Sequence, residues 1–168
     1  MTGTAHKVML LGEIGVGKSS LAQRLMFNRF SGQYKPTIGV EVYRYNVPDD
    51  VAGGPMTLIL WDTDGNFGDA IFNHVYIKEA AAAIIVGDPL RPETLATTVR
   101  LAEGFAEVRP GRAIHFILNK WDLITPANVP VLPTAYKTRP LMKASALSGD
   151  QVSEAFSEVA RAIRRRGH

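Results

Sequence analysis

Short apolar runs alternate along this chain with longer segments of mixed polarity. Five stretches rich in apolar or β-branched residues have the length of strands: residues 8–11, 40–47, 56–61, 80–86 and 113–118. The last two are almost entirely apolar, as expected for strands that are buried on both faces of a sheet. The turn-rich connection at 48–55 favours a hairpin between the second and third stretches.

Apolar residues recur at helical spacing in three further segments. Residues 20–26 place Leu21, Leu25 and Met26 on one face, and residues 92–108 repeat the pattern over more turns. A third stripe comprises Val152, Ala155, Phe156, Val159, Ala160 and Ile163, which is typical of an amphipathic helix. Four prolines between 126 and 140 allow only a short helix there. The alternation predicts an α/β fold, with a mostly parallel sheet covered by helices on both faces.

Composition limits the domain organisation and the partners. With 168 residues, 46% of them hydrophobic, the chain is long enough for one core, so we expect a single domain over residues 1–168. A net charge of +3 suits a polyanionic ligand and is too small to indicate nucleic acid as a partner. The arginines at 161 and 164–166 are expected to complement a helix dipole, with contact to an acidic membrane or a partner as the alternative.

The absence of cysteine excludes several kinds of chemistry. Disulfides, thiolate zinc sites, cysteine nucleophiles and lipidation on cysteine are all ruled out. No glycine directly follows Met1 for myristoylation, no apolar signal region is present, and the run at 80–86 is far shorter than a bilayer span. We therefore expect a cytoplasmic protein without a covalent lipid anchor, whose membrane contact is weak or made through a partner.

A phosphate-binding motif lies between the first predicted strand and the first predicted helix. Residues 12–19, GEIGVGKS, match G-x-x-x-x-G-K-[ST] in the strand–loop–helix context that the motif requires. Glycines let the main chain approach phosphates, Lys18 reaches the terminal phosphates, and the Ser19 hydroxyl is suited to Mg²⁺. The predicted nucleotide contacts are Glu13, Ile14, Gly15, Val16, Gly17, Lys18, Ser19 and Ser20. The alternative is a glycine-rich turn that matches by chance.

A second motif, N-K-x-D, directly follows the run at 113–118. It consists of Asn119, Lys120 and Asp122, at a position where ligands bind in open α/β sheets. The Asp122 carboxylate is suited to accept two hydrogen bonds from guanine, whereas adenine lacks the 2-amino donor. Asn119 would tie the loops together, and the Lys120 stem would lie along the base. Alone this motif is often a solvated strand end, but downstream of a phosphate loop it indicates a guanine pocket.

Together these motifs make the chain resemble a small GTPase of the Ras superfamily, closest to the Rab type, over essentially its whole length. Phe30 with residues 34–41 resembles the first switch, residues 60–65 the second-switch strand, and residues 143–147 the last guanine motif. The resemblance implies the P-loop NTPase fold, a three-layer α/β/α sandwich whose six-stranded sheet is mostly parallel with one antiparallel edge strand. It also implies GTP or GDP and Mg²⁺ as ligands.

The resemblance assigns roles to individual residues. Phe30 and Tyr34 would contact the nucleotide from the first switch, and Ser145, Ala146 and Leu147 would line the base. Ser19, Thr37 and Asp62 would be the metal ligands, Asp62 through water. Lys18, Thr37, Gly65 and Asn66 would form the catalytic set, with Asn66 at the position of the family's water-orienting glutamine.

Departures from the family pattern predict slow hydrolysis. Asn66 is one methylene shorter than glutamine and is followed by Phe67, while Ile14 stands where the family has a small residue or serine. Asp64 replaces the usual alanine and would either support Mg²⁺ or repel the γ-phosphate, unless it simply faces solvent.

The expected function is a slow GTPase switch. The alternative is a hydrolysis-deficient GTP-binding module held in one nucleotide state; a P-loop kinase or ATPase is disfavoured by Asn119 and Asp122.

Partner binding is expected at the switch regions. Val42, Trp61 and Tyr76 correspond to the surface that Rab-like proteins present to effectors, although Val42 replaces an aromatic residue. Burial of Trp61 in the core is the competing interpretation. An exchange factor and an activating protein are further expected partners.

Overall fold

Six strands form one sheet in the order β2-β3-β1-β4-β5-β6. The computed structural model describes residues 3–32, 39–63 and 76–167. Its strands are β1 (Thr4–Leu11), β2 (Val40–Val47), β3 (Met56–Thr63), β4 (Ala82–Gly87), β5 (Ala113–Leu118) and β6 (Leu141–Lys143). Only the edge strand β2 runs antiparallel to its neighbour, while all other pairs are parallel. The predicted sheet is confirmed, including its antiparallel edge.

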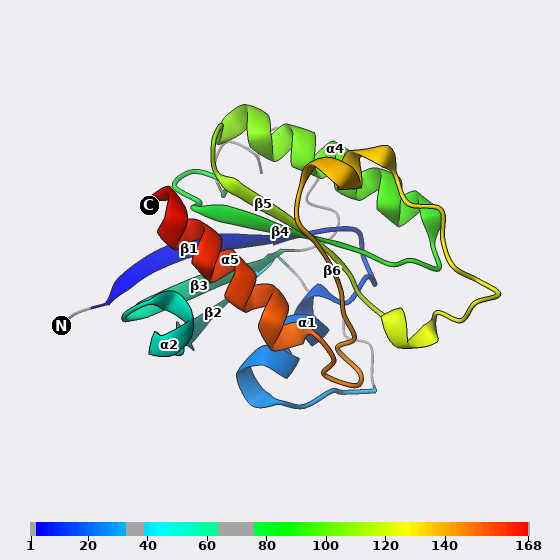
Figure 1. Ribbon diagram of the computed structural model, residues 1–168, viewed down its shortest axis with the longest axis horizontal. Helices are drawn as coiled ribbons and strands as arrows, with labels where there is room; N and C mark the ends of the chain where they lie inside the picture. The colour runs from blue at the N-terminus through cyan, green and yellow to red at the C-terminus, as the bar shows by residue number, and fades with distance from the viewer. Residues whose placement is uncertain (1–2, 33–38, 64–75, 168) are drawn as a thin grey trace.

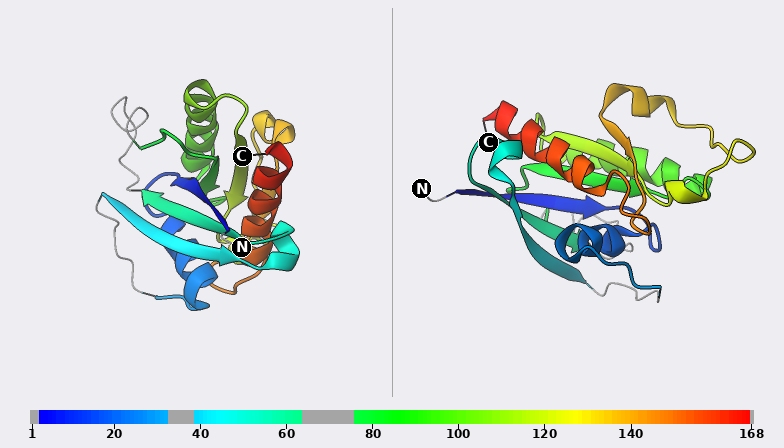
Figure 2. Two further views of the ribbon diagram at one scale, coloured as in Figure 1. Left: turned by 90° about the vertical axis from the view of Figure 1, so that its left-hand side faces the viewer. Right: turned by 60° about the horizontal axis from the view of Figure 1, so that its bottom comes forward.

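Helices cover both faces of this sheet (Figures 1 and 2). They are α1 (Lys18–Phe27), α2 (Asp49–Ala52), α4 (Pro92–Val108) and α5 (Val152–Arg166), with the short 3-10 helices η1 (Trp121–Leu123) and η2 (Thr134–Thr138). One apolar cluster joins the sheet to α1 and α5, and a second joins it to α4. The result is the predicted three-layer α/β/α sandwich.

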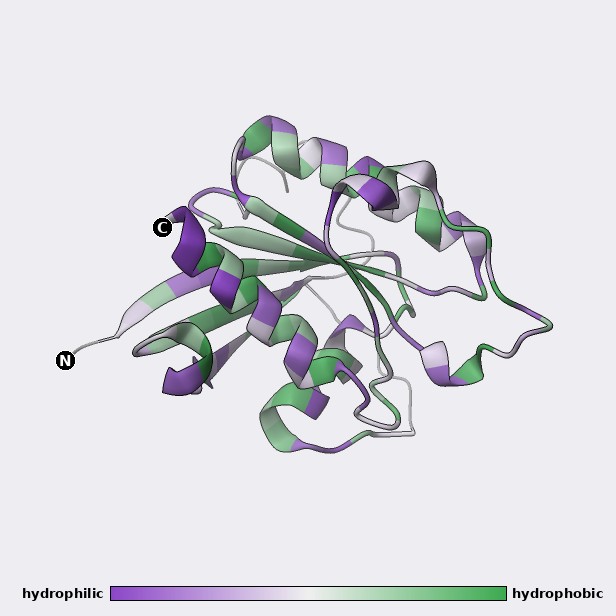
Figure 3. Cartoon of the chain, viewed as in Figure 1, coloured by the Kyte–Doolittle hydropathy of each residue, from purple (hydrophilic) through white to green (hydrophobic). Residues whose placement is uncertain are grey.

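Alternating residues of β1 serve the two clusters. Val8 and Leu10 belong to the cluster with α1 and α5, whereas Met9 and Leu11 belong to the cluster with α4. Successive strand side chains point to opposite faces, so a strand covered on both sides has to be apolar at every position. Figure 3 shows this as hydrophobic colour along the central strands and alternating colour along the outer helices.

The structure differs from the sequence prediction at some boundaries. Strand β1 starts at Thr4 rather than residue 8, because its first residues pair with Met56 and its neighbours by backbone although they carry little apolar pattern. The expected hairpin connection contains the one-turn helix α2, which ends at Ala52 and is followed by Gly53 with φ 72°. Arg164 of α5 donates to the Ala52 carbonyl at 2.9 Å, so α2 is fixed from the C-terminal helix. Among the described residues, no helix has the length and apolarity needed to span a bilayer.

Candidate nucleotide-binding site

The predicted phosphate and base motifs meet at one edge of the sheet. The phosphate loop follows β1, Asn119 follows β5, and Ser145 lies shortly after β6, so all are at carboxyl ends of parallel strands. Segments that are far apart in the sequence are thereby brought together where open α/β sheets bind ligands.

Two positions of the phosphate loop accept only glycine. Gly12 has φ 147°, and a Cβ there would lie 2.5 Å from the Val86 carbonyl oxygen. Gly17 has φ 100°, and a Cβ would overlap the side-chain amide of Asn119. Gly17 also forms the N-cap of α1 without a side-chain hydrogen bond among the described residues. The main chain therefore approaches its neighbours closely, and the positive end of α1 faces the loop.

Lys18 is buried beside the loop that it follows. Its Nζ donates to the carbonyl oxygens of Gly12 at 2.7 Å and Glu13 at 3.0 Å. The Glu13 side chain itself turns toward α4, where it accepts a 2.8 Å hydrogen bond from Thr97. The ammonium charge is thus held at the loop by weakly basic carbonyl oxygens, which a phosphate can replace.

Ser19 and Asp62 form the oxygen pair of the predicted magnesium site. The Ser19 hydroxyl donates to Asp62 Oδ2, and Asp62 is fully buried at the end of β3. Its other oxygen, Oδ1, has no hydrogen-bond partner among the described residues. Burial raises the pKa of Asp62 to about 6, although the Ser19 hydrogen bond and the Lys18 charge oppose this rise. A buried carboxylate oxygen without a partner, beside a hydroxyl, fits a hard cation such as Mg²⁺.

Asn119 connects the phosphate loop to the base motif. Its Nδ2 donates to the Val16 carbonyl oxygen and its Oδ1 accepts from the Ala146 amide, both at 3.0 Å. The side chain is buried, and all of these groups lie on different loops. One amide therefore fixes the distance between the segments that would hold phosphate and base.

Lys120 and Asp122 complete this side of the site. Lys120 has φ 60°, and its Nζ donates to the Gly15 carbonyl oxygen at 2.8 Å and to Asp88 at 2.9 Å. Asp122 is exposed on η1 and accepts a 2.7 Å hydrogen bond from the Ser145 hydroxyl. An exposed carboxylate that is oriented by one hydrogen bond keeps acceptor capacity for a ligand.

Arg24 supports the base motif from α1. Its Nε donates to Ala146 O at 2.8 Å and its Nη2 donates to Leu147 O at 2.5 Å. Neither the type of this residue nor its position in the helix marks a contact with a loop more than a hundred residues away, so the sequence did not predict it.

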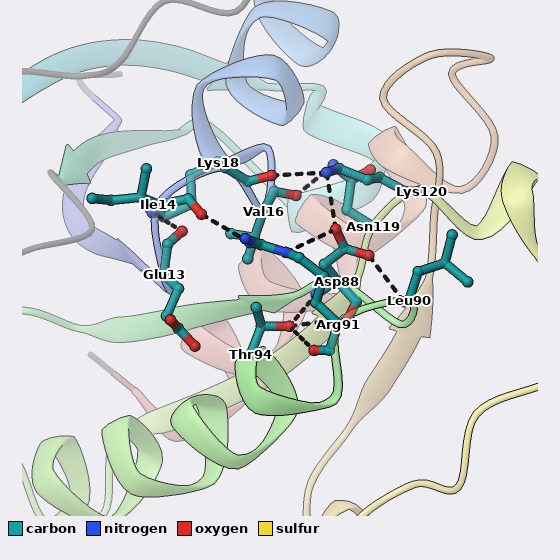
Figure 4. A network of polar contacts seen from close by, with 11 residues as sticks. Glu13, Ile14, Val16, Lys18, Asp88, Leu90, Arg91, Thr94, Asn119 and Lys120 are labelled. Carbon is teal, nitrogen blue, oxygen red and sulfur yellow. Dashed lines mark hydrogen bonds and ion pairs between the residues drawn. The ribbon is translucent and has the colours of Figure 1, made fainter.

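Asp88 and Arg91 were also not predicted, and Figure 4 shows them beside the phosphate loop. Asp88 is buried directly after β4 and forms ion pairs with Lys120 and Arg91. One signal was present in the sequence: Asp88 is the first charged residue after a fully buried strand, at the edge where the other motifs lie.

Some of the predicted site residues are not described by the structure, and others are partly or largely exposed. Tyr34, Thr37, Gly65 and Asn66 fall outside the described residues, as do Asp64 and Phe67. Ser20 lies half-buried in the first turn of α1, and Phe30 lies beyond the end of that helix with 39% of its surface exposed. Ile14 is 43% exposed at the outside of the phosphate loop, and Leu147 is exposed at the base motif.

The predicted partner surface is contiguous. Val42 of β2 stands opposite Trp61 of β3, and the rings of Trp61 and Tyr76 have centroids 6.1 Å apart. Val42 is exposed while both aromatic rings are half-buried. The Lys7 ammonium lies 3.8 Å from the Trp61 ring centroid. Trp61 therefore lies at the boundary between the core and the surface.

Comparisons with known proteins agree with this geometry. Residues 7–165 match a family model described as Ras family. The human Ras-related protein Rab-34 is 35% identical over 95% of this chain and 65% of its own length. Ras-related protein Rab11E of Lotus japonicus is 34% identical over 91% of this chain and 72% of its own length. The chain thus spans somewhat less than two thirds of the length of Rab-34. It belongs to the Ras family of small GTPases and resembles its Rab-related members.

Proposed function

We propose that this protein is a guanine-nucleotide switch that binds GTP with Mg²⁺, hydrolyses it slowly to GDP and phosphate, and binds partners according to the nucleotide. The observation that carries this proposal is the double hydrogen bond of Asn119 to Val16 O and the Ala146 amide. It holds a phosphate loop and a purine-recognition loop as one unit. Family membership supports the same function.

Selectivity for guanine is assigned to Asp122. Its carboxylate is exposed and oriented by Ser145, so it can accept hydrogen bonds from the ring N–H and the 2-amino group of guanine. Adenine has neither a ring N1–H nor a 2-amino group and would leave both acceptors unpaired, each at a cost of about 1–3 kcal/mol or more for a charged group.

Hydrolysis needs few reacting groups from the protein. A water oxygen forms a bond to the γ-phosphorus while the bond to the β–γ bridging oxygen breaks, which releases GDP and inorganic phosphate. Lys18 and the loop amides stabilise the charge that develops on the leaving oxygen. Ser19 and Asp62, with Thr37, would hold Mg²⁺, which neutralises phosphate charge when bound. Gly65 would face the γ-phosphate, and Asn66 is the proposed water-orienting residue.

A hydrolysis-deficient GTP-binding module is the second candidate. The exposed Ile14 side chain favours it, because a branched apolar group at the outside of the loop obstructs an arginine supplied by an activating protein. Asn66 adds to this, since its shorter side chain orients water less well.

The proposed partners are an effector at Val42, Trp61 and Tyr76, an exchange factor and an activating protein. Trp61 supports this surface because its half-buried ring is held by Tyr76 and Lys7 while neighbouring Val42 is exposed. We propose a cytoplasmic location, with membrane contact made weakly or through a partner, and no nucleic-acid partner.

Nucleotide analysis tests the proposal directly. The purified chain is denatured and the released nucleotide identified by chromatography, after which GTP, GDP and ATP are titrated by calorimetry in the presence of Mg²⁺. We expect bound GDP or GTP and tight binding of both, with ATP much weaker. ATP binding as tight as GTP binding, or no heat with GTP, would refute the proposed function.

Single-turnover phosphate release separates the two candidates. Wild type is compared with Asn66→Gln and Asn66→Ala after loading with GTP. A slow switch releases phosphate faster than Asn66→Ala. If wild type releases phosphate at the same rate as Asn66→Ala, while Asn66→Gln releases it faster, the chain is the hydrolysis-deficient module.

A further inference from the structure

Two cations from different loops meet one buried carboxylate behind the phosphate loop. Asp88 Oδ2 lies 2.9 Å from Lys120 Nζ and 3.4 Å from Arg91 Nε. Both cations also donate to the loop: Lys120 Nζ to Gly15 O and Arg91 Nη2 to Ile14 O, each at 2.8 Å. Consecutive carbonyl oxygens of the loop are therefore held from the same side.

The backbone that carries Arg91 is tightly fixed. Arg91 N donates to Asp88 O at 3.0 Å, and the buried Thr94 hydroxyl contacts both the amide and the carbonyl of Asp88. Arg91 is the N-cap of α4, and Pro92 follows in the first turn, where its restricted φ favours the helix. The guanidinium therefore starts from a rigid turn rather than from a mobile loop.

The Arg91 guanidinium lies along the outside of the loop, between Ile14 and Asp88 (Figure 4). A Cβ on Gly15 would stand 3.7 Å from Nη2, so the group is in van der Waals range of the next residue as well. The Ile14 oxygen and the Gly15 N–H belong to one planar trans peptide and point in opposite directions. Arg91 thus directs the Gly15 amide away from α4.

We propose that Arg91 is a positioning residue for nucleotide binding: by holding the Ile14 carbonyl from behind, it aims the Gly15 amide at the phosphates. This inference rests on the proposed guanine-nucleotide function and adds a residue to it. Asp88 keeps the guanidinium in place, and the neighbouring Lys120 holds the next peptide in the same way.

An arginine suits this role better than a lysine. Its planar fork presents Nη2 to the carbonyl while Nε faces Asp88, so two nitrogens in a fixed relative geometry serve the two partners. A lysine at this position would have to reach both partners with one nitrogen, as Lys120 does for Gly15 and Asp88. Without this contact, the conformation of the phosphate loop in the ligand-free chain would depend on glycines, whose backbone can adopt many conformations.

The test measures dissociation constants for GDP and GMP in wild type, Arg91→Ala, Arg91→Lys and the control Arg161→Ala. Arg161 is on the far helix α5, half-exposed and paired only with Glu158 among the contacts described. Loop amides cradle the α- and β-phosphates, and GMP lacks the β-phosphate. We expect Arg91→Ala to weaken GDP binding about three- to tenfold and GMP binding less. Arg91→Lys should recover part of the lost affinity. The control Arg161→Ala should bind both nucleotides as tightly as wild type.

The ratio of the GMP to the GDP dissociation constant distinguishes positioning from fold stabilisation. A residue that only stabilises the fold changes the melting temperature of the nucleotide-free chain and leaves this ratio unchanged. An unchanged ratio in Arg91→Ala, or the same change in Arg161→Ala, overturns the inference while wild-type GDP binding still supports the proposed function. Wild type that binds no GDP overturns the proposed function itself.

Discussion

The side-chain amide of Asn119 occupies the space into which a Cβ on Gly17 would project. The same amide nitrogen donates to Val16 O, so the close approach is part of the contact that joins the phosphate loop to the base motif. Gly17 is therefore required both by its φ of 100° and by a residue about a hundred positions away.

Replacing this glycine should disable the site. In Gly17→Ala, we expect backbone strain of about 1–3 kcal/mol and displacement of Asn119, so that nucleotide no longer co-purifies. Chromatography of the released nucleotide and urea unfolding measure the two effects. Gly104→Ala is the matched control: Gly104 lies in α4 with open space for a Cβ, and alanine there should stabilise the chain by about 0.5–1 kcal/mol. Normal nucleotide content in Gly17→Ala would contradict this account of the loop.

Asp122 should determine the base that is bound. In Asp122→Asn, the charged acceptor becomes an amide that can donate, so GTP affinity should fall about 10²-fold or more. Xanthosine triphosphate, which has a carbonyl in place of the 2-amino group, should be bound better than by wild type. Competition titrations with both nucleotides measure the change. Asp50→Asn, an exposed site on α2, serves as the control, and equal GTP affinity in the two variants would refute the role of Asp122.

The Asp62 carboxylate should destabilise the metal-free chain and stabilise the magnesium-bound one. Because burial raises its pKa to about 6, the ionised carboxylate destabilises the metal-free chain at neutral pH. We expect Asp62→Asn to stabilise the metal-free chain in urea unfolding by up to about 3 kcal/mol. The added stability that Mg²⁺ and GDP confer on wild type should be largely lost. A variant that keeps the full magnesium effect would show that Asp62 is not a ligand.

His115 should make stability depend on pH. Burial in β5 lowers its pKa to about 4, with the Arg165 and Arg166 charges in the same direction and the Glu158 charge opposing them. On this side chain the unfolded chain takes up a proton near pH 6.5, whereas the folded chain does so only near pH 4. The stability that the neutral imidazole contributes to the folded chain is therefore fully present above pH 6.5 and is lost as pH falls toward 4. We expect a loss of about 3 kcal/mol over this window.

The measurement compares urea unfolding of wild type and His115→Leu from pH 7 to pH 4.5. Asp62 titrates in the same window in both chains, so the difference between the two isolates His115. The stability advantage of wild type over the variant should shrink as pH falls. A difference that does not change with pH would mean that the imidazole titrates at the same pH in the folded and the unfolded chain.

Local patterns were enough to predict most elements and the motifs. Each strand buried on both faces carries a nearly continuous apolar run, and α5 carries a stripe at helical spacing, because burial acts on residues close in the sequence. The phosphate loop is equally local: its glycines, Lys18 and Ser19 are contiguous, and the chemistry needs them in that order. The one-turn helix α2 is too short to produce a period, so it was not predicted.

What the sequence determined by itself was therefore most of the strands and helices and the two ligand motifs, since both follow from neighbouring residues. Only the tertiary structure decided that Asp88 and Arg91 lie behind Ile14 and Gly15, because that contact depends on β4 pairing beside β1. It also decided that Asn119 excludes a side chain at Gly17. Strand order in a sheet arises from packing of the whole chain, and no local period encodes which loops it brings together.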